Sequence, residues 1–489
     1  MIPIAKVTKL DGNTGAVKPG AKGIVAILAP SSAGTPNQAA TYTKARQAVL
    51  DFGYGALTEY AAQIMATSGN PVVLVKGSTS TAGVPGAVVT AGTGTALATT
   101  TTAGSAPNDD YNAAQVVIVN GGAVGAAGIT YTYSLDSGQV VSATLALGTS
   151  TTITIPNSGV VFTLGTGTLV SGDTITAGMT GPRMTTSDLT TALEALRVSS
   201  QPWEMVLVGG HDATGATVSI LDIWLAAREA EGRYRAFICN AVPRATATQT
   251  EAQYAIAMNT AWSTVTSIRG CVCADVGDVV SALPGRGITQ QRYVALALAA
   301  RAAKIQYGVD PAFVADGPVA GFGLSDARGN PKNHDENVYP GLDALRLVTL
   351  RSFDRKAGTF ITNANVISSQ GSDYVWLQHL RTMNRACEIA FDQLTQQLSR
   401  GIRKSTKLGP NGEVYIAEED AQRIDALVNQ SLAELRSQVS DLRFTLSRTD
   451  NIGANGPVVL NGDLKLSALA YVKEFDTNAA FVRTVTVQS

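Results

Sequence analysis

The chain has 489 residues, enough for two to four domains of about 100–200 residues each. Its 37 lysine and arginine residues and 38 aspartate and glutamate residues leave a formal net charge of −1, a balance that argues against bulk electrostatic capture of nucleic acid. The first residues lack the apolar core of a secretory signal, and no run approaches the roughly 18 consecutive apolar residues of a membrane span, so we expect a soluble protein made in a cytoplasm.

Residues 1–20 contain few apolar side chains, scattered among prolines and glycines. Because so few apolar residues cannot build a core element, we predict an extended arm. An apolar strand at 24–28, helical periodicity through 49–64 and a second apolar strand at 72–75 then predict a right-handed βαβ unit in a sheet that is covered on both faces.

The composition changes between Lys76 and Arg183, where the chain has no lysine or arginine and only four charged residues: Asp109, Asp110, Asp136 and Asp173. Threonine, glycine, alanine and valine dominate, and repeated alternation of apolar and polar residues predicts an all-β domain inserted at 78–181. The first part of this insert, 78–104, is either weak strands or flexible low-complexity chain, and the sequence leaves both interpretations open.

Helical and continuous apolar segments alternate again after the insert. They predict helices at 188–197, 218–229, 252–267 and 290–304 and strands at 205–208, 235–239 and 270–274. This alternation is typical of a doubly wound, largely parallel sheet, so the predicted fold class is α/β, and the insert splits one core domain into 21–77 and 182–340.

Residues 341–478 are predicted to form an α+β domain. Two strands at 345–350 and 359–367 precede a long helix that opens near Ser372. A second helix begins at Glu418, and strands follow at 442–446, 458–460 and 464–472. The long helix carries one apolar stripe and leaves Arg381 and Arg385 off it. The stripe consists of Trp376, Leu380, Met383, Cys387, Phe391, Leu394 and Leu398.

The last segment, 479–489, contains the alternating run Phe481–Val487 and nothing after it that covers a strand. An uncovered strand of this kind is an aggregation hazard unless another sheet takes it up. We therefore predict a second terminal arm.

The pattern of elements in 341–478 resembles the carboxy-terminal domain of contractile-tail sheath proteins of bacteriophages. The matching positions are Phe353, Gly358, Phe360, Asn363, Ser368, Tyr374 and Arg381. Ala29-Pro30, Gly34 and Phe52-Gly53 are similar to the opening of sheath proteins. The segment Asn363-Ala364-Asn365 departs from the commoner aromatic and arginine, so the chain is identified as a divergent member of that family.

The resemblance implies a structural protein that is not an enzyme and has no cofactor. Many copies would polymerise helically around a tail tube and contract to drive the tube through the host envelope for genome delivery. The implied partners are further copies of the chain, the tail tube protein, and the baseplate and tail terminator proteins, without direct contact to nucleic acid and without membrane insertion. The implied location is the tail of a virion assembled in the host cytoplasm, with the insert facing outward and 341–478 facing the tube.

Sheath proteins exchange terminal arms, so the resemblance also assigns inter-subunit strands to both ends of the chain. The assigned residues are Ile2, Ile4, Val7, Phe481, Val482, Arg483, Thr484, Val485, Thr486 and Val487. Five basic residues become tube-facing candidates: Arg381, Arg385, Arg400, Arg403 and Lys404. We expect the last three, with Lys407, to close the long helix, where cations suit the negative end of the dipole; a solvated helix end without a function is the alternative.

Sites of covalent or metal chemistry find little support in the sequence. Gly209-Gly210-His211-Asp212 follows a strand, where α/β enzymes place ligands, but we favour a polar loop that caps the sheet. His334-Asp335-Glu336 contains cation ligands, although adjacent residues on a loop more often face water. The four cysteines, Cys239, Cys271, Cys273 and Cys387, are interpreted as reduced, buried thiols. No metal site, catalytic triad or Walker loop is recognisable.

Two alternatives to the sheath function stay open at this point. One is a sheath-like subunit of a related contractile injection system, such as a bacteriocin or a secretion apparatus. The other is an α/β enzyme with a ligand site near Gly209–Asp212.

Overall fold

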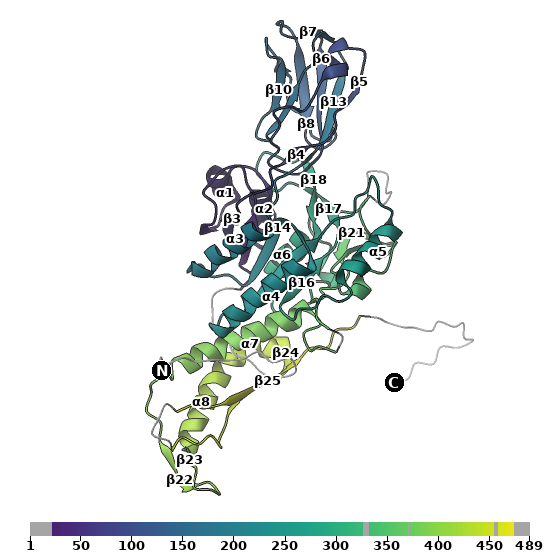
Figure 1. Ribbon diagram of the computed structural model, residues 1–489. Helices are drawn as coiled ribbons and strands as arrows, with labels where there is room; N and C mark the ends of the chain where they lie inside the picture. Colours follow the sequence, from purple (N-terminus) through teal and green to yellow (C-terminus); the bar gives the residue numbers. More distant parts are fainter. Residues whose placement is uncertain (1–21, 326–331, 370, 454–457, 474–489) are drawn as a thin grey trace, which may run out of the picture.

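The computed structural model describes residues 22–325, 332–369, 371–453 and 458–473 (Figure 1). Its central sheet has six strands in the order β16-β15-β14-β1-β3-β2. Five of them are parallel, and their mostly buried apolar residues suit strands that lie between two layers of helices. These five are β1 (Val25–Ala29), β3 (Val72–Lys76), β14 (Met205–Ala213), β15 (Ala236–Ala241) and β16 (Gly270–Cys273). The sixth, β2 (Ala39–Tyr42), pairs antiparallel with β3 at the edge.

Helices cover both faces of this sheet. Successive residues of β1 point to opposite faces, so Ile27 belongs to one hydrophobic core and Leu28 to the other. The first core contains residues of α2 (Ala56–Ser68), α6 (Val294–Lys304) and α7 (Leu377–Thr395). The second contains residues of α3 (Thr186–Val198), α4 (Gly215–Ala230) and α5 (Glu251–Trp262). The α/β sheet expected from the alternating segments is therefore present.

The first predicted helix is divided in two. α1 (Ala45–Phe52) ends at Gly53, and α2 begins after Gly55. Both glycines have positive φ angles, 68° and 150°, and a Cβ on Gly53 would lie 2.3 Å from the Ser32 hydroxyl oxygen. Only glycine fits this turn, which returns the chain to the loop after β1.

Several boundaries differ from the predictions. The expected helix at 290–304 starts as a strand, β18 (Thr289–Tyr293), which pairs with β17 (Val276–Val280), and only then becomes α6. The expected strand at 345–350 begins at Leu350, as β20 (Leu350–Phe353), and its partner is β21 (Lys356–Ile361). The long helix α7 begins at Leu377, five residues after Ser372. The described residues of 458–460 form no strand.

The insert consists of short antiparallel strands with a hydrophobic core of their own, at one end of the molecule (Figure 1). Its main sheet has the order β4-β13-β6-β8-β9, and β5 also pairs with β13. The strands of this sheet are β4 (Val84–Pro85), β5 (Val89–Ala91), β6 (Tyr111–Asn120), β8 (Thr130–Ser134), β9 (Leu145–Ala146) and β13 (Thr174–Thr180). Two small sheets, β7 (Gly122–Ala123) with β12 (Thr168–Leu169) and β10 (Thr152–Ile155) with β11 (Val160–Thr163), complete it. Residues 78–104 thus contain weak strands.

The C-terminal lobe, which we define as the elements from α7 to β25, lies at the opposite end from the insert (Figure 1). After α7 it contains β22 (Lys404–Leu408), β23 (Val414–Ile416), α8 (Glu418–Ser431), a 3-10 helix (Leu432–Gln438), β24 (Val439–Leu446) and β25 (Gly462–Ala468). A separate hydrophobic core joins α7, α8, β24 and β25. Across the described parts of the chain, no helix is long and apolar enough to cross a membrane.

Candidate assembly site

The strands β24 and β25 form a two-stranded antiparallel sheet that packs on α8. Phe444 and Leu446 of β24 and Leu464 of β25 are buried against Ile424 and Val428 of α8. Two strands alone are only marginally stable in water, and here the helix supplies the missing apolar contact.

Side chains of α8 occupy the outer edge of β24. The Asn429 amide accepts a hydrogen bond from the Phe444 N–H and donates one to the Phe444 carbonyl, both at 2.8 Å. The Asp425 carboxylate accepts the Leu446 N–H at 2.7 Å. These contacts satisfy the peptide groups through which β24 would otherwise bind a further strand.

The outer edge of β25 is different. Phe444 pairs with Leu464, and because the Phe444 peptide groups face α8, the antiparallel pattern turns those of Leu464 away from β24. The same alternation turns the peptide groups of Leu466 outward. Among the described residues, none forms a hydrogen bond with these groups of Leu464 and Leu466. β25 therefore presents an edge to which a strand can be added.

The residues predicted to form the two arms lie outside the described residues. They are Ile2, Ile4, Val7, Phe481, Val482, Arg483, Thr484, Val485, Thr486 and Val487. Their assignment to inter-subunit strands stays a prediction.

Two of the predicted tube-facing residues, Arg381 and Arg385, are buried. The Arg381 side chain is 1% exposed, and its Nε lies 2.6 Å from Oε1 of Glu204 in the core domain. The Arg385 Nε donates to Glu434 at 2.6 Å, and both arginines lie over the ring of Tyr307. The prediction is wrong for these residues because α7 is covered on both flanks, by the central sheet and by the rest of the C-terminal lobe.

Arg400, Arg403 and Lys404 are exposed, but they do not close α7 as predicted. α7 ends at Thr395, Arg400 lies in the following loop, and Lys404 begins β22. The helix dipole therefore does not explain them. Arg403 forms ion pairs with Glu419 and Asp420, at the start of α8. A tube-facing function for the three exposed residues stays a prediction.

The residues Gly209–Asp212 are used in packing. A Cβ on Gly209 would lie 2.6 Å from the Tyr60 ring, and Gly210, with a φ of 61°, fits against Pro30. The buried His211 ring contacts the Met184 carbonyl at 2.8 Å and the Thr217 hydroxyl at 3.0 Å. Asp212 accepts a 2.5 Å hydrogen bond from Tyr293. The predicted loop is wrong, because residues 209–212 continue β14 as far as Ala213, with a register shift against β15. The contacts of these residues do not favour the ligand site.

The four aspartates of the insert all form internal contacts. Arg292 of β18 binds both carboxylate oxygens of Asp109, at 2.8 and 2.7 Å, in a buried pair. Asp110 pairs with Arg183 at 3.0 Å, and Asp136 accepts the Thr289 N–H at 3.0 Å. The fourth, Asp173, accepts backbone N–H groups within the insert. Three of the four thus tie the insert to its base or to the core domain.

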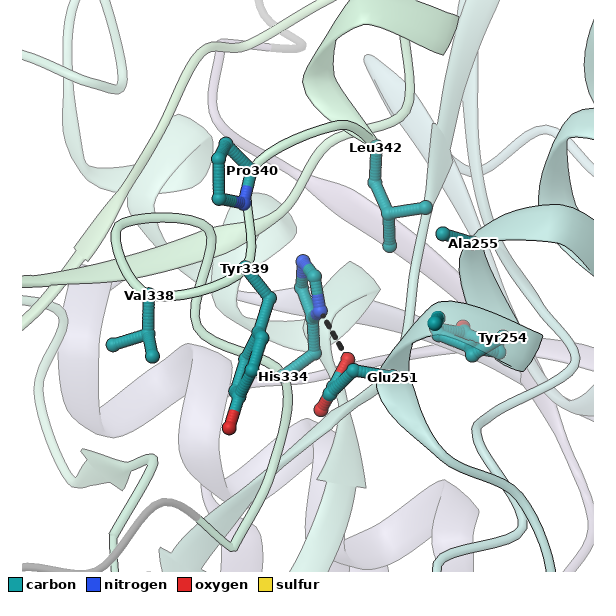
Figure 2. Close-up of a pocket in the computed structure, with 9 residues that line it drawn as sticks. Glu251, Tyr254, Ala255, His334, Val338, Tyr339, Pro340 and Leu342 are labelled. Atoms are coloured by element: carbon teal, nitrogen blue, oxygen red, sulfur yellow. Dashed lines mark hydrogen bonds and ion pairs between the residues drawn. The ribbon is translucent and has the colours of Figure 1, made fainter.

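His334 lies in the wall of a cavity of about 290 Å³ between α5 and the loop 338–342 (Figure 2). Its Nδ1 is 2.9 Å from Glu251, and its Nε2 is 3.0 Å from Glu336. Burial opposes a charge on the ring, but the hydrogen bonds to these two carboxylates outweigh it and raise the pKa of His334 to about 9. The interpretation of a loop facing water is wrong here, because His334, Asp335 and Glu336 are all buried and the ring contacts two carboxylates.

The cysteine prediction is confirmed. All four cysteines are buried and free, and burial raises the pKa of the Cys239 thiol far above its usual range. Within the described parts of the chain, no group of three or more histidine, cysteine, aspartate or glutamate side chains is arranged to hold a metal ion.

Residues 2–365 match the family model described as DUF2586, N-terminal domain. The chain belongs to this family. Comparison with curated proteins gives no match. Two solved structures are similar to it, each with a TM-score of 0.45. The sheath tail protein of Listeria innocua is 12% identical, and the match covers 93% of this chain and 97% of that one. The sheath tail protein of Desulfitobacterium hafniense is 10% identical, with 93% and 99% covered.

Two features of the site in this DUF2586 chain are not evident from its sequence. Asn429 and Asp425 of α8 close the outer edge of β24, so β25 is the strand of this pair that keeps an open edge. A strand pattern alone does not reveal such a cap. The base of the insert left one signal: a region with aspartates but without lysine or arginine can form ion pairs only with cations from elsewhere in the chain, as Asp109 and Asp110 do.

Proposed function

We propose that the chain is a structural tail sheath subunit that polymerises helically around a tail tube and contracts to drive the tube through the host envelope. The observation that carries the proposal is the edge of β25, with which none of the described residues pairs, in a chain that also contains the alternating, strand-forming segment Phe481–Val487. Its element pattern and the residues that resemble sheath proteins support the same function.

An open edge and a terminal strand complement each other between copies. β25 has seven residues, and Phe481–Val487 also has seven, which at about 3.3 Å per residue gives a paired length of roughly 23 Å. Backbone hydrogen bonds along this length supply affinity, and alternate side chains supply specificity. A strand donated by one copy to the next would link subunits into a continuous chain.

Such links suit a polymer that changes its shape. Buried ion pairs join the core domain to the insert and to α7, so in this proposal they move as one body. Strand links between such bodies persist while the bodies rotate. In this proposal the exposed Arg400, Arg403 and Lys404 face the tube in a contact weak enough to break during contraction. The function requires no covalent chemistry.

Negative-stain electron microscopy of the intact chain and of a chain that ends at Lys473 tests the proposal. We expect striated tubes from the intact chain at rising concentration and only single particles from the shortened one. Circular dichroism should show that the shortened chain is folded, since its described core remains complete. Tubes formed by the shortened chain would contradict the proposal.

A further inference from the structure

The last described residues of the chain are fixed to the core domain. The Tyr471 hydroxyl donates a 2.5 Å hydrogen bond to the Gly308 carbonyl. Lys473 forms an ion pair with Asp310, and its ammonium lies 4.4 Å from the centre of the Trp376 ring. We call these contacts the clasp. Because of the clasp, the segment 474–489 starts from a defined point on the molecule.

That starting point lies within reach of the open edge of β25 in the same chain. From Ala468 to Lys473 there are five residues, which span at most about 18 Å. The seven residues 474–480 span up to roughly 23 Å when extended. The chain beyond the clasp is therefore long enough to return and place Phe481 beside Ala468.

The segment Phe481–Val487 matches β25 in its alternation of apolar and polar residues when the two run antiparallel with Phe481 beside Ala468. Val485 then stands opposite Leu464, on the face that packs against α8. The other face pairs Thr484 with Lys465 and Thr486 with Asp463, whose side chains are exposed and polar. On the face that meets the core, Phe481, Val485 and Val487 are apolar, and Arg483 is the exception, opposite the half-buried Leu466. On the exposed face Thr484 and Thr486 are polar, and Val482 lies opposite Ser467. The alternation therefore favours this register at five of the seven positions.

We propose that, in the free subunit, Phe481–Val487 pairs with β25 of its own chain and so blocks the edge that links subunits in the polymer. A tether of this length holds the strand at an effective concentration of about 1 mM, so at micromolar protein the pairing within one chain prevails. In a growing polymer, the β25 edges of neighbouring subunits are present at an effective concentration comparable to that within one chain. The strand then moves from its own β25 to that of a neighbour, as in domain swapping. Only this exchange rests on the proposed function; the pairing within one chain does not.

Hydrogen exchange at residue resolution tests the pairing. The Leu464 and Leu466 amides point to the free edge, so we expect them to exchange at least about tenfold more slowly in the intact chain than in a Val485→Pro variant. In the proposed register the Val485 N–H faces Leu464, and proline removes this donor. Thr484→Pro is the matched control, because the Thr484 N–H faces away from β25, and we expect it to keep most of the protection. The Phe444 and Leu446 amides, capped by α8, should not change in either variant.

Concentration separates the two modes of pairing. Protection that is equal at about 1 µM and about 50 µM shows pairing within one chain, whereas protection that rises with concentration shows pairing between chains and overturns the inference. Equal exchange in the intact chain and Val485→Pro also overturns it. Electron microscopy tests the proposed function independently. Tubes formed by a protein whose free subunit shows no protection of the β25 amides contradict only this inference. Protected amides without tubes contradict only the proposed function.

Discussion

His334 joins α5 to the loop that follows residue 332, through Glu251 on one side and Glu336 on the other. Its neighbours define its electrostatics. Arg244 also contacts Glu251 at 3.1 Å, and Asp275 accepts the His334 N–H at 2.7 Å. A protonated ring balances these carboxylates, so its charge adds to the backbone contacts that hold the loop.

The pH dependence of this contact follows from the sign of the pKa shift. The folded pKa of about 9 lies above the ordinary value near 6.5, so the stabilisation is complete below pH 6.5 and is lost as the pH rises through 9. We expect His334→Gln to lower the free energy of unfolding by about 2–3 kcal/mol near pH 6, and by much less near pH 10. Urea unfolding of both proteins across this range measures the difference.

His379→Gln is a control whose effect on stability should depend on pH in the opposite direction. Burial lowers the pKa of His379, so the native protein disfavours protonation there, and the variant should gain stability relative to the parent as the pH falls. A His334→Gln effect that does not change with pH would contradict an ionised His334.

At the scale of elements, the continuous apolar strands and the capped helices of the core domain can be predicted from the local sequence pattern. α3, for example, is preceded by the capping residue Thr185, whose hydroxyl forms a capping box with Asp188. β18 could not be predicted. Its Gln290 and Arg292 are buried polar residues that suggest a helix surface, and the partner of Arg292 is Asp109, 183 residues away. The free edge of β25 could not be predicted either, because it depends on contacts between α8 and β24 that a strand pattern does not contain.

The exposed basic residues lie in the loop after α7 and at the start of β22, and their predicted function can be measured. We expect Arg400→Glu with Lys404→Glu to weaken co-sedimentation with tail tubes at low salt. The difference in binding between the variant and the parent protein should disappear near 1 M salt, where the Debye length is about 3 Å. Arg355→Glu with Lys356→Glu makes the same change of charge at two exposed residues, one in the turn after β20 and one at the start of β21, and should leave binding unchanged. Equal binding by both double variants would remove Arg400 and Lys404 from the tube contact.

At the scale of the whole molecule, the insert and the C-terminal lobe occupy opposite ends and differ in how they use charge (Figure 1). The lobe keeps basic residues at its surface. The insert has only four aspartates, of which Asp109, Asp136 and Asp173 are buried and Asp110 is paired with Arg183. The insert therefore offers almost no formal charge to a partner, and its contacts should depend little on salt. Its charges instead hold it against β18 and the return to the core domain.

The buried pair of Arg292 and Asp109 is the strongest candidate for what holds the insert in position, and a double-mutant cycle can measure its contribution. Removing either partner leaves an unpaired charge in a buried site, so Arg292→Met or Asp109→Leu should each cost about 3–5 kcal/mol of stability. The double variant should recover much of that loss, because it leaves neither charge. Calorimetry of the four proteins gives the coupling. Losses that simply add would mean that the pair does not act as a unit and that the insert is held by Arg286, Ile288 and its other contacts with the core domain.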